Sequence, residues 1–275
     1  MRKLLFKSVG GSLNVLSYVA PMYASKKAIK LLSTPRKGKL QDSEIPILQS
    51  AYYEELDYNG VSIATYRWIG KNTTVLLAHG WESNTARWDR LIRQLKQENH
   101  NIVALDAPAH GKSEGREFNA ILYSEFIFKV AKKHKPEVVI GHSVGGMACV
   151  FGQSKYKLPS IKKMVLLGVP AHFEGLYKRY VKLMGYNTKI AEGMNNLILH
   201  RFGHKPDYFS VANFSENLGV KGLIIHDCFD TIIPYEEALL LHQYFKNSEL
   251  ITTSNLGHSL NSPTVNENII NFIKS

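Results

Sequence analysis

The stretch PEVVIGHSVGG, residues 136–146, decides the fold of this chain. Its first half is a short apolar run that predicts a buried strand, and Met147–Phe151 predict the start of a helix. The turn between them is so tight that only glycine fits two positions before and two positions after Ser143. Such a turn lifts the Ser143 hydroxyl above the edge of the sheet, where the first helical turn points its backbone N–H groups.

A serine placed in this way needs partners further along the chain. Its hydroxyl is a poor nucleophile until a base takes the proton, and an acid must orient that base. In a strand–turn–helix of this kind the acid and then the histidine follow the serine in sequence. Asp230 lies in the loop after a predicted core strand at 222–226, and His258 lies just past another strand at 249–253.

Two alternatives stay open for these partners. Asp227 competes with Asp230 as the acid, although it could instead hydrogen-bond backbone groups of the turn. Asp230 is favoured because it lies four residues before Pro234, which starts a helix. After Asp230 the only histidines are His242, inside that helix, and His258, beside a glycine in a loop. We therefore predict the set Ser143, Asp230 and His258.

Acyl transfer also needs hydrogen-bond donors aimed at the developing oxyanion. The Val144 N–H, directly after the serine, is one candidate. A predicted strand at 74–78 runs into His79-Gly80-Trp81, where Gly80 permits a sharp turn, so the Trp81 N–H is the second candidate. We expect His79 to brace this loop, and the Trp81 ring to wall the pocket.

These motifs resemble those of the α/β-hydrolase superfamily, over about residues 52–273. The matching segments are the His-Gly pair at 79–80, DAPAHGKS at 106–113, the turn at 141–145, the segment from His226 to Pro234, and Gly257-His258. The resemblance implies that Asp106 and His110 belong to a structural loop. One departure is Asp227, which stands where the family usually has glycine, and it keeps the choice of acid open.

The predicted elements alternate between strands and helices. Strands are expected at 52–58, 61–69, 73–79, 101–105, 137–142, 161–168, 221–226 and 249–253. Helices are expected at 86–98, 120–134, 144–154, 234–246 and 264–274. Asn59-Gly60 predicts an antiparallel N-terminal hairpin. The rest predicts a mostly parallel sheet with helices on both faces, the α/β-hydrolase fold, with ligands bound beyond the carboxyl ends of the strands.

About fifty residues after Pro170 break the alternation and are rich in aromatic side chains. Members of the family often insert a helical cap at this place, so we expect one here, with most of its aromatic residues packing the cap. The predicted organisation is a basic arm at 1–45, the first part of the core at 46–170, the cap at 171–219 and the second part of the core at 220–275.

The net charge of +11 is unevenly distributed. Nine basic residues precede Asp42 with no acidic one among them, and the rest of the chain is balanced to within two charges. A nearly neutral body argues against nucleic acid as a partner. Two cysteines, Cys149 and Cys228, give no disulfide framework and favour a reducing compartment. No spacing predicts a metal site or a phosphate-binding loop, so we expect no metal or organic cofactor.

The N-terminal segment is too short and too broken by Gly10, Gly11 and Pro21 to predict a membrane span, and it makes a weak signal peptide. We expect a cytoplasmic protein whose arm either contacts an anionic membrane surface or docks on the body through Ile29, Leu31 and Leu32. The predicted function is a serine esterase or thioesterase acting on a small-molecule substrate through a catalytic triad. The alternatives are a membrane-associated lipid hydrolase and a catalytically inert binding module.

Overall fold

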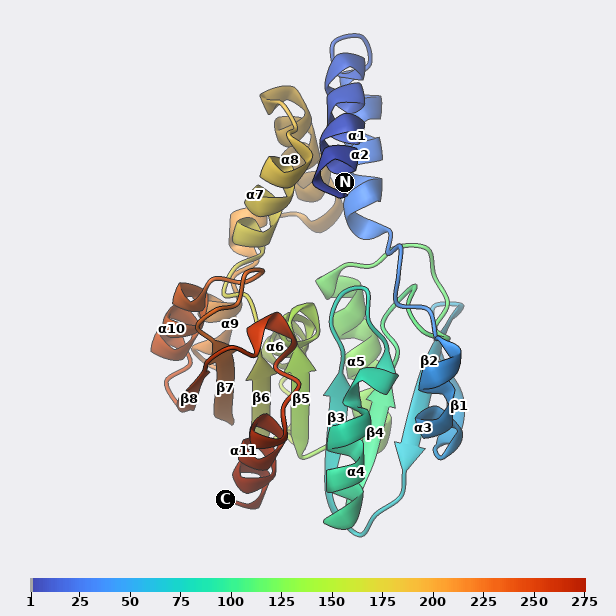
Figure 1. Cartoon of the computed structure of the whole chain (residues 1–275), viewed down its shortest axis with the longest axis vertical. Coiled ribbons are helices and arrows are strands. Elements are labelled where there is room, and N and C mark those ends of the chain that lie inside the picture. Colours follow the sequence, from blue (N-terminus) through green and yellow to red (C-terminus); the bar gives the residue numbers. More distant parts are fainter. Residues whose placement is uncertain (1) are drawn as a thin grey trace. The chain divides into compact units, whose positions relative to one another are not determined.

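The computed structural model describes residues 2–275, and the chain in it divides into two compact units. A helical unit comprises the chain up to Thr34 together with His172–Ser210. A sheet-containing unit comprises Pro35–Ala171 and Val211–Ser275. Each unit is thus built from two separate stretches of sequence (Figure 1). Among the described residues, no helix is both long enough and apolar enough to span a bilayer.

The sheet-containing unit is built on eight strands in the order β1-β2-β4-β3-β5-β6-β7-β8. Their bounds are β1 Tyr52–Tyr58, β2 Val61–Trp68, β3 Asn72–Ala78, β4 His100–Leu105, β5 Val138–His142, β6 Lys163–Leu167, β7 Lys221–Asp227 and β8 Ser248–Thr253. β2 pairs antiparallel with β1 and β4, and every other pairing in this sheet is parallel. The predicted sheet is confirmed, with strand ends within two residues of those expected.

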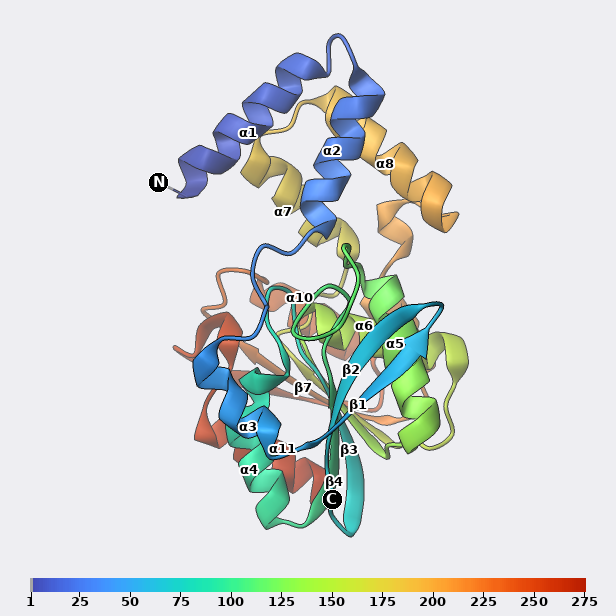
Figure 2. The ribbon, with the colours of Figure 1, turned by 90° about the vertical axis from the view of Figure 1, so that its right-hand side faces the viewer.

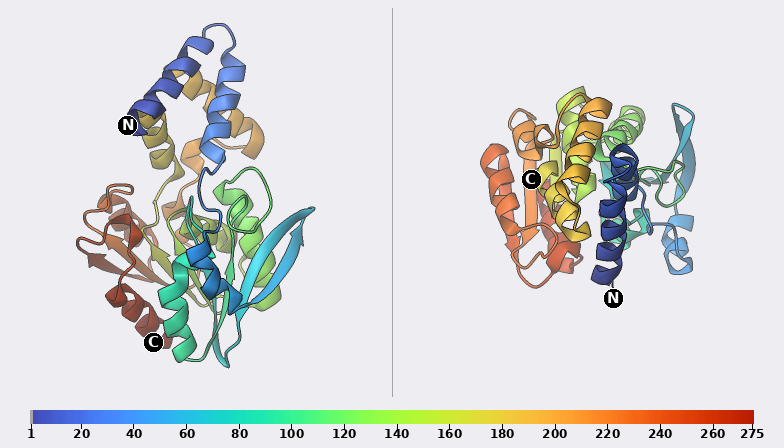
Figure 3. Two further views of the ribbon diagram at one scale, coloured as in Figure 1. Left: turned by 45° about the vertical axis from the view of Figure 1, so that its right-hand side comes forward. Right: turned by 90° about the horizontal axis from the view of Figure 1, so that it is seen from above.

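The predicted hairpin is also confirmed. Tyr58 pairs with Val61 across a turn in which Asn59 and Gly60 both have positive φ angles, 51° and 78°. That geometry is the two-residue turn whose twist matches the twist of the flanking strands. The β1–β2 hairpin forms one edge of the sheet, and β8 forms the other (Figure 3).

Helices cover both faces of this sheet. Their bounds are α3 Ile45–Gln49, α4 Asp89–Gln97, α5 Ala120–His134, α6 Val144–Tyr156, α9 Val211–Ser215, α10 Tyr235–Tyr244 and α11 Pro263–Lys274, with 3₁₀ turns η1 Asp42–Glu44, η2 Thr85–Trp88 and η4 Gly257–Ser259. α4 and α11 lie together on one side, and α5 and α6 lie on the other (Figure 2). This arrangement buries both faces of the parallel strands, whose central residues are apolar and inaccessible to solvent.

One core cluster runs between the sheet and the α4–α11 face. Ile92 and Leu95 of α4 and Ile269 of α11 are fully buried there against strand residues such as Leu77 and Ile140. Burying side chains of this size is worth about 1.5–3 kcal/mol each. The carboxyl ends of β5, β7 and β8 are thereby fixed relative to one another, and the candidate site residues follow these strand ends.

The helical unit contains two helical hairpins. The first is α1 Arg2–Leu16 with α2 Pro21–Ser33, and the second is α7 Phe173–Met184 with α8 Thr188–Phe202, followed by the 3₁₀ turn η3 Pro206–Tyr208. α1 packs on α7 and α2 packs on α8. The arm and cap segments, considered separately in the sequence, therefore fold together.

Small residues mediate this packing. A Cβ atom added at Gly10 of α1 would lie 1.7 Å from the Met184 backbone oxygen, and one added at Gly193 of α8 would lie 2.1 Å from the Ser25 Oγ of α2. Ala24 and Ala28 of α2 are fully buried. Backbones that approach so closely have no room for larger side chains, so α2 docks through small residues, whereas Ile29, Leu31 and Leu32 are only partly buried.

Candidate active site

Ser143 occupies the strained turn between β5 and α6. Its φ of 52° and ψ of −125° are unusual for a residue with a side chain. A Cβ at Gly141 would lie 2.4 Å from the Gly146 Cα, and one at Gly145 would lie 2.3 Å from the His79 backbone oxygen. The predicted strand–turn–helix is present, and its flanking glycines are required by close backbone contacts.

Three side chains from distant parts of the sequence form one hydrogen-bonded series. The Ser143 Oγ lies 3.0 Å from the His258 Nε2, and the His258 Nδ1 lies 2.6 Å from the Asp230 Oδ2. The carboxylate accepts from Nδ1, which leaves Nε2 to accept the serine proton. The three residues predicted from the sequence therefore come together within hydrogen-bonding distance.

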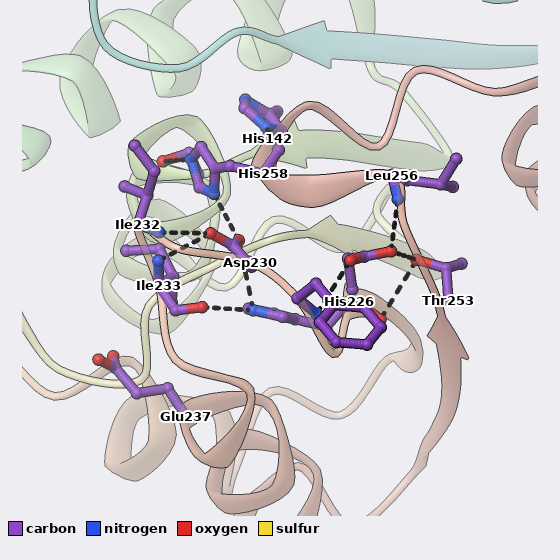
Figure 4. A network of polar contacts seen from close by, with 12 residues as sticks. His142, His226, Asp230, Ile232, Ile233, Glu237, Thr253, Leu256 and His258 are labelled. Atoms are coloured by element: carbon purple, nitrogen blue, oxygen red, sulfur yellow. Dashed lines mark hydrogen bonds and ion pairs between the residues drawn. The ribbon is translucent and has the colours of Figure 1, made fainter.

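The Asp230 carboxylate is inaccessible to solvent, yet it is stabilised in its charged form. Burial alone would raise its pKa. The hydrogen bond with His258 and the N–H groups of Ile233 and Ile232 outweigh burial and hold the pKa of Asp230 below its usual range. Figure 4 shows this carboxylate surrounded by its donors. Asp230 is thus an anion that orients the His258 ring and can stabilise a positive charge on it.

Asp227, the alternative acid, has a different set of partners. Its Oδ2 accepts from the Leu256 N–H at 2.9 Å and from the Thr253 hydroxyl at 2.8 Å, and its Oδ1 accepts from the Phe229 N–H at 3.0 Å. Burial would raise the pKa of Asp227, but these bonds outweigh burial and lower it. Asp227 ties the end of β8 to the loop that carries Asp230, and it is Asp230 that the His258 Nδ1 contacts.

The two candidate oxyanion donors belong to segments beside the serine, Val144 directly after it and Trp81 directly after Gly80. Val144 is the first residue of α6, so its N–H has no acceptor within the helix. A Cβ added at Gly80 would lie 3.1 Å from the Ser143 Cβ, which shows how closely the β3–η2 loop approaches the serine. The Trp81 ring packs against His110 and Phe118, with centroids 5.5 Å and 5.2 Å away.

Comparison with known proteins agrees with this geometry. A family model described as the alpha/beta hydrolase fold matches residues 73–188. A monoacylglycerol lipase of Mycolicibacterium smegmatis is 30% identical over 131 residues, 44% of this chain and 46% of the lipase. A pimeloyl-[acyl-carrier protein] methyl ester esterase of Pectobacterium carotovorum is 22% identical over 229 residues, 68% of this chain and 88% of the esterase. The solved structure of the Pyrococcus furiosus esterase Pf2001 superimposes with a TM-score of 0.65 at 20% identity, covering 88% of this chain and 96% of the esterase.

The chain has the α/β-hydrolase fold. Relatives named as esterases and lipases support ester hydrolysis as its general class of reaction. Among the residues that the structure describes, no group of three or more His, Cys, Asp or Glu side chains is arranged to hold a metal ion.

His79 supports the site without facing the reacting atoms. Its Nδ1 donates to the Gly80 backbone oxygen at 2.8 Å, and its Nε2 accepts from the Ala107 N–H at 2.9 Å. Burial is the main cause that lowers the pKa of His79 well below its usual value, so the ring is neutral and bridges two loops of the sheet-containing unit.

Asp106 and His110 lie in the DAPAHGKS loop that follows β4. Asp106 accepts from the N–H groups of Thr85 and Lys112, each at 2.9 Å, and from the Tyr66 hydroxyl at 3.1 Å. His110 Nε2 accepts from the Glu82 N–H at 3.0 Å. Three of these four contacts tie the side chains to backbone N–H groups of the chain, as expected of a structural loop.

The structure gives contacts to two histidines that stood within the sequence motifs but were assigned no role there. His142, next to the serine, donates from Nε2 to the His258 backbone oxygen at 2.8 Å. His226, fully buried at the end of β7, donates from Nε2 to the Ile233 backbone oxygen at 2.9 Å and lies 3.5 Å from the Asp230 carboxylate. His142 directly precedes Ser143, and His226 directly precedes Asp227. This position beside a candidate site residue was the only signal in the sequence that pointed to either histidine.

Arg87 of η2 is a third residue beside the site. Its Nη2 donates to the Ser259 backbone oxygen at 3.0 Å, one residue after His258. Burial lowers the pKa of Arg87 to about 10, so the guanidinium still carries its charge at neutral pH. Arg87 and His142 thus hold two consecutive carbonyl groups of the turn that carries His258.

Proposed function

We propose that the protein is a serine hydrolase that cleaves a carboxylic ester or a thioester through an acyl-enzyme intermediate. One observation carries the proposal, the continuous hydrogen-bonded series from Ser143 Oγ through His258 to a buried, ionised Asp230. A nucleophile, a base within reach and an acid that orients the base are the parts that acyl transfer requires.

In the first half-reaction Ser143 Oγ bonds to the substrate carbonyl carbon, and its proton passes to His258 Nε2. The carbonyl oxygen becomes an oxyanion that the Val144 and Trp81 N–H groups stabilise. Collapse of this intermediate expels the alcohol or thiol, which takes the proton from His258. Asp230 keeps the charged imidazole oriented throughout.

In the second half-reaction water replaces the departed alcohol or thiol. His258 Nε2 takes a proton from this water as its oxygen bonds to the acyl carbon. The tetrahedral intermediate then releases the carboxylic acid, and the proton returns to Ser143 Oγ. The neighbouring His142 and Arg87 contacts favour one fixed position of the imidazole during both halves.

Hydrolysis of a short p-nitrophenyl ester by purified Ser143→Ala protein tests the proposal. We expect a loss in kcat of about 10³-fold or more, with the fold intact by circular dichroism. Ser154→Ala on the same helix α6 is the matched control and should keep full activity. Full activity of Ser143→Ala would overturn the proposal.

Fluorophosphonate labelling separates this function from that of an inert binding module. A working serine hydrolase forms a covalent adduct at Ser143, which peptide mass spectrometry locates, and a binding module forms none. Ester and thioester substrates with the same acyl group then determine which leaving group the site prefers.

Lipid esters are a second candidate substrate class, supported by the local similarity to a monoacylglycerol lipase. A lipid hydrolase should show a jump in activity when the substrate concentration passes the point where micelles form. An enzyme for soluble esters should show ordinary saturation across the same range.

A further inference from the structure

The excess positive charge of the chain is concentrated in the helical unit. The stretches that form this unit contain twelve basic and three acidic residues, so they account for +9 of the total of +11. Its α1–α2 hairpin contains no acidic residue at all. A positive field of this size attracts an anionic partner.

One end of the same unit exposes large apolar side chains. The turn between α1 and α2 and its two flanking helix ends form a surface that we name the apolar turn, made of Val15, Tyr18, Val19, Met22 and Tyr23. Val19 is 83% exposed and Val15 is 72% exposed, higher than any other large apolar residue in the described part of the chain apart from Leu4 at 72%. No charged residue occurs from Ser8 to Ser25.

Polar contacts behind the apolar turn hold it in place. The Asn14 side chain donates to the Gly185 backbone oxygen at 2.8 Å and accepts from the Asn187 N–H at 2.9 Å. The Asn187 side chain in turn donates to the Ser17 hydroxyl at 2.9 Å. These bonds join the α1–α2 turn to the α7–α8 turn, so the apolar side chains are presented on a braced surface.

Lysines border the apolar turn. The Lys189 Nζ lies 4.4 Å from the centre of the Tyr18 ring, and the Lys27 Nζ lies 5.1 Å from the centre of the Tyr23 ring. Lys26 is exposed on the same helix as Lys27. The surface combines exposed aliphatic side chains, two tyrosines and lysines close to those tyrosines, the kinds of side chain that favour the acyl-chain boundary, the headgroup region and the phosphate groups of a lipid layer.

We propose that the apolar turn docks the protein on an anionic phospholipid membrane. Val15, Val19 and Met22 enter the boundary between headgroups and acyl chains, Tyr18 and Tyr23 lie at headgroup level, and the lysines pair with lipid phosphates. This docking does not depend on the proposed hydrolase activity. A nucleic-acid partner would contact the lysines but would leave the exposed aliphatic side chains without a role. A lipid membrane explains both the lysines and the aliphatic side chains of the apolar turn.

Co-sedimentation of the full chain with vesicles containing about one-third phosphatidylserine, with the rest phosphatidylcholine, tests the proposal. We expect binding that weakens as salt rises and that is absent on pure phosphatidylcholine vesicles. A V19D/M22D variant should bind about 10²-fold more weakly, because both aliphatic anchors are lost. Met22 is the second residue of α2, where an acidic side chain favours the helix, so the variant should fold.

Two matched controls accompany these variants. I69D/L239D adds the same two charges at exposed apolar positions of the other unit and should bind like the unsubstituted protein. K26Q/K27Q/K189Q should lose about 10²-fold in binding at low salt, whereas K71Q/K129Q/K132Q, with the same charge removed elsewhere, should lose far less. Hydrolysis of a soluble ester should be unchanged in all four.

The vesicle experiment tests membrane docking independently of catalysis, because Ser143→Ala should lose ester hydrolysis and still bind vesicles as well as the unsubstituted protein. Equal vesicle binding by V19D/M22D and the unsubstituted protein would overturn the proposal. It would also be overturned if the unsubstituted protein ignored vesicles and instead formed dimers, by light scattering, that V19D/M22D dissociated. Salt-dependent binding to duplex DNA that V19D/M22D leaves intact, with no vesicle binding, would identify a nucleic-acid surface instead.

Discussion

His142 donates a hydrogen bond from its Nε2 to the backbone oxygen of His258, 2.8 Å away. Burial, with a further contribution from Arg87, lowers the pKa of His142 well below its usual value, so the ring is neutral. Its backbone precedes the candidate nucleophile directly, and its side chain holds the candidate base. His142 therefore links the backbone beside Ser143 to the backbone of His258 and helps to fix the distance between these two residues.

The first prediction concerns this contact. His142→Ala removes the donor, so the imidazole of His258 samples more positions and kcat falls by about 5–30-fold, the equivalent of one hydrogen bond. KM for a small ester should change little. His142→Gln retains an N–H donor and should recover part of the loss. His242→Ala on α10 serves as the control and should be neutral; if it costs as much as His142→Ala, the positioning role is wrong.

Substitution of Asp230 should mainly lower kcat, whereas substitution of Asp227 should mainly lower stability. Asp230→Asn removes the charge that orients His258 and should lower kcat by up to about 10⁴-fold, with a modest change in melting temperature. Asp227→Asn disturbs the bonds to Leu256 and Thr253, so it should lower stability while kcat falls by less than about 10-fold. Steady-state kinetics paired with thermal melts measures both. The assignment reverses if Asp227→Asn is the variant with the larger loss in kcat.

Stability should decline as the pH falls below about 6.5, the ordinary pKa of histidine. Burial lowers the pKa of His110 to about 4 and lowers those of His79 and His142 well below normal, so all three are neutral in the folded protein. In the unfolded chain they take up protons from pH 6.5 downward, so the unfolded state gains stability as the pH drops. Each contributes a slope of up to about 1.4 kcal/mol per pH unit.

Urea unfolding at pH 7 and pH 5 checks this prediction. His110→Asn should flatten the pH dependence of the unfolding free energy, although it lowers stability at pH 7. An unchanged slope in that variant would mean that His110 is protonated in the folded state. Asp230 adds a separate loss only at lower pH, because its folded pKa lies below its ordinary value of about 3.9.

Substitutions at Gly10 and Gly11, two neighbouring residues of α1, test how closely the α1–α2 hairpin packs on α7. Gly10→Ala places a Cβ against the Met184 backbone oxygen and should separate α1 from α7, lowering the melting temperature and increasing proteolysis within residues 2–34. Gly11→Ala meets no atom within 4 Å and should stabilise the helix by up to about 1 kcal/mol. Equal effects of the two substitutions would contradict the close approach of α1 to α7.

The sequence predicted the sheet-containing unit well because its signals are local. Apolar runs such as 137–140 mark buried strands, Asn59-Gly60 marks a hairpin, and the glycines around Ser143 mark a turn that few other residues tolerate. The positions of Asp230 and His258 after successive strands brought them to one edge of the sheet. These patterns depend on neighbours within a few residues, so they can be read without knowing the fold.

The helical unit could not be predicted in the same way. Its two hairpins approach each other through Gly10, Ala24, Ser25 and Gly193, small residues that an apolar pattern does not mark as contacts. The bonds between Asn14 and the α7–α8 turn join positions more than 170 residues apart. The roles of His142 and His226 were hidden for a related reason, since both bond to backbone oxygens, which every residue possesses.

The composite origin of the helical unit has a consequence for synthesis on the ribosome. α1 and α2 leave the ribosome first, but the segment that carries their partners begins only at His172. At about 5–20 residues per second, the roughly 140 intervening residues take on the order of 10–30 s. For that time the nascent chain carries a basic, apolar hairpin without its tertiary partners. A chain arrested before His172 would present this hairpin permanently, as a target for chaperones and proteases.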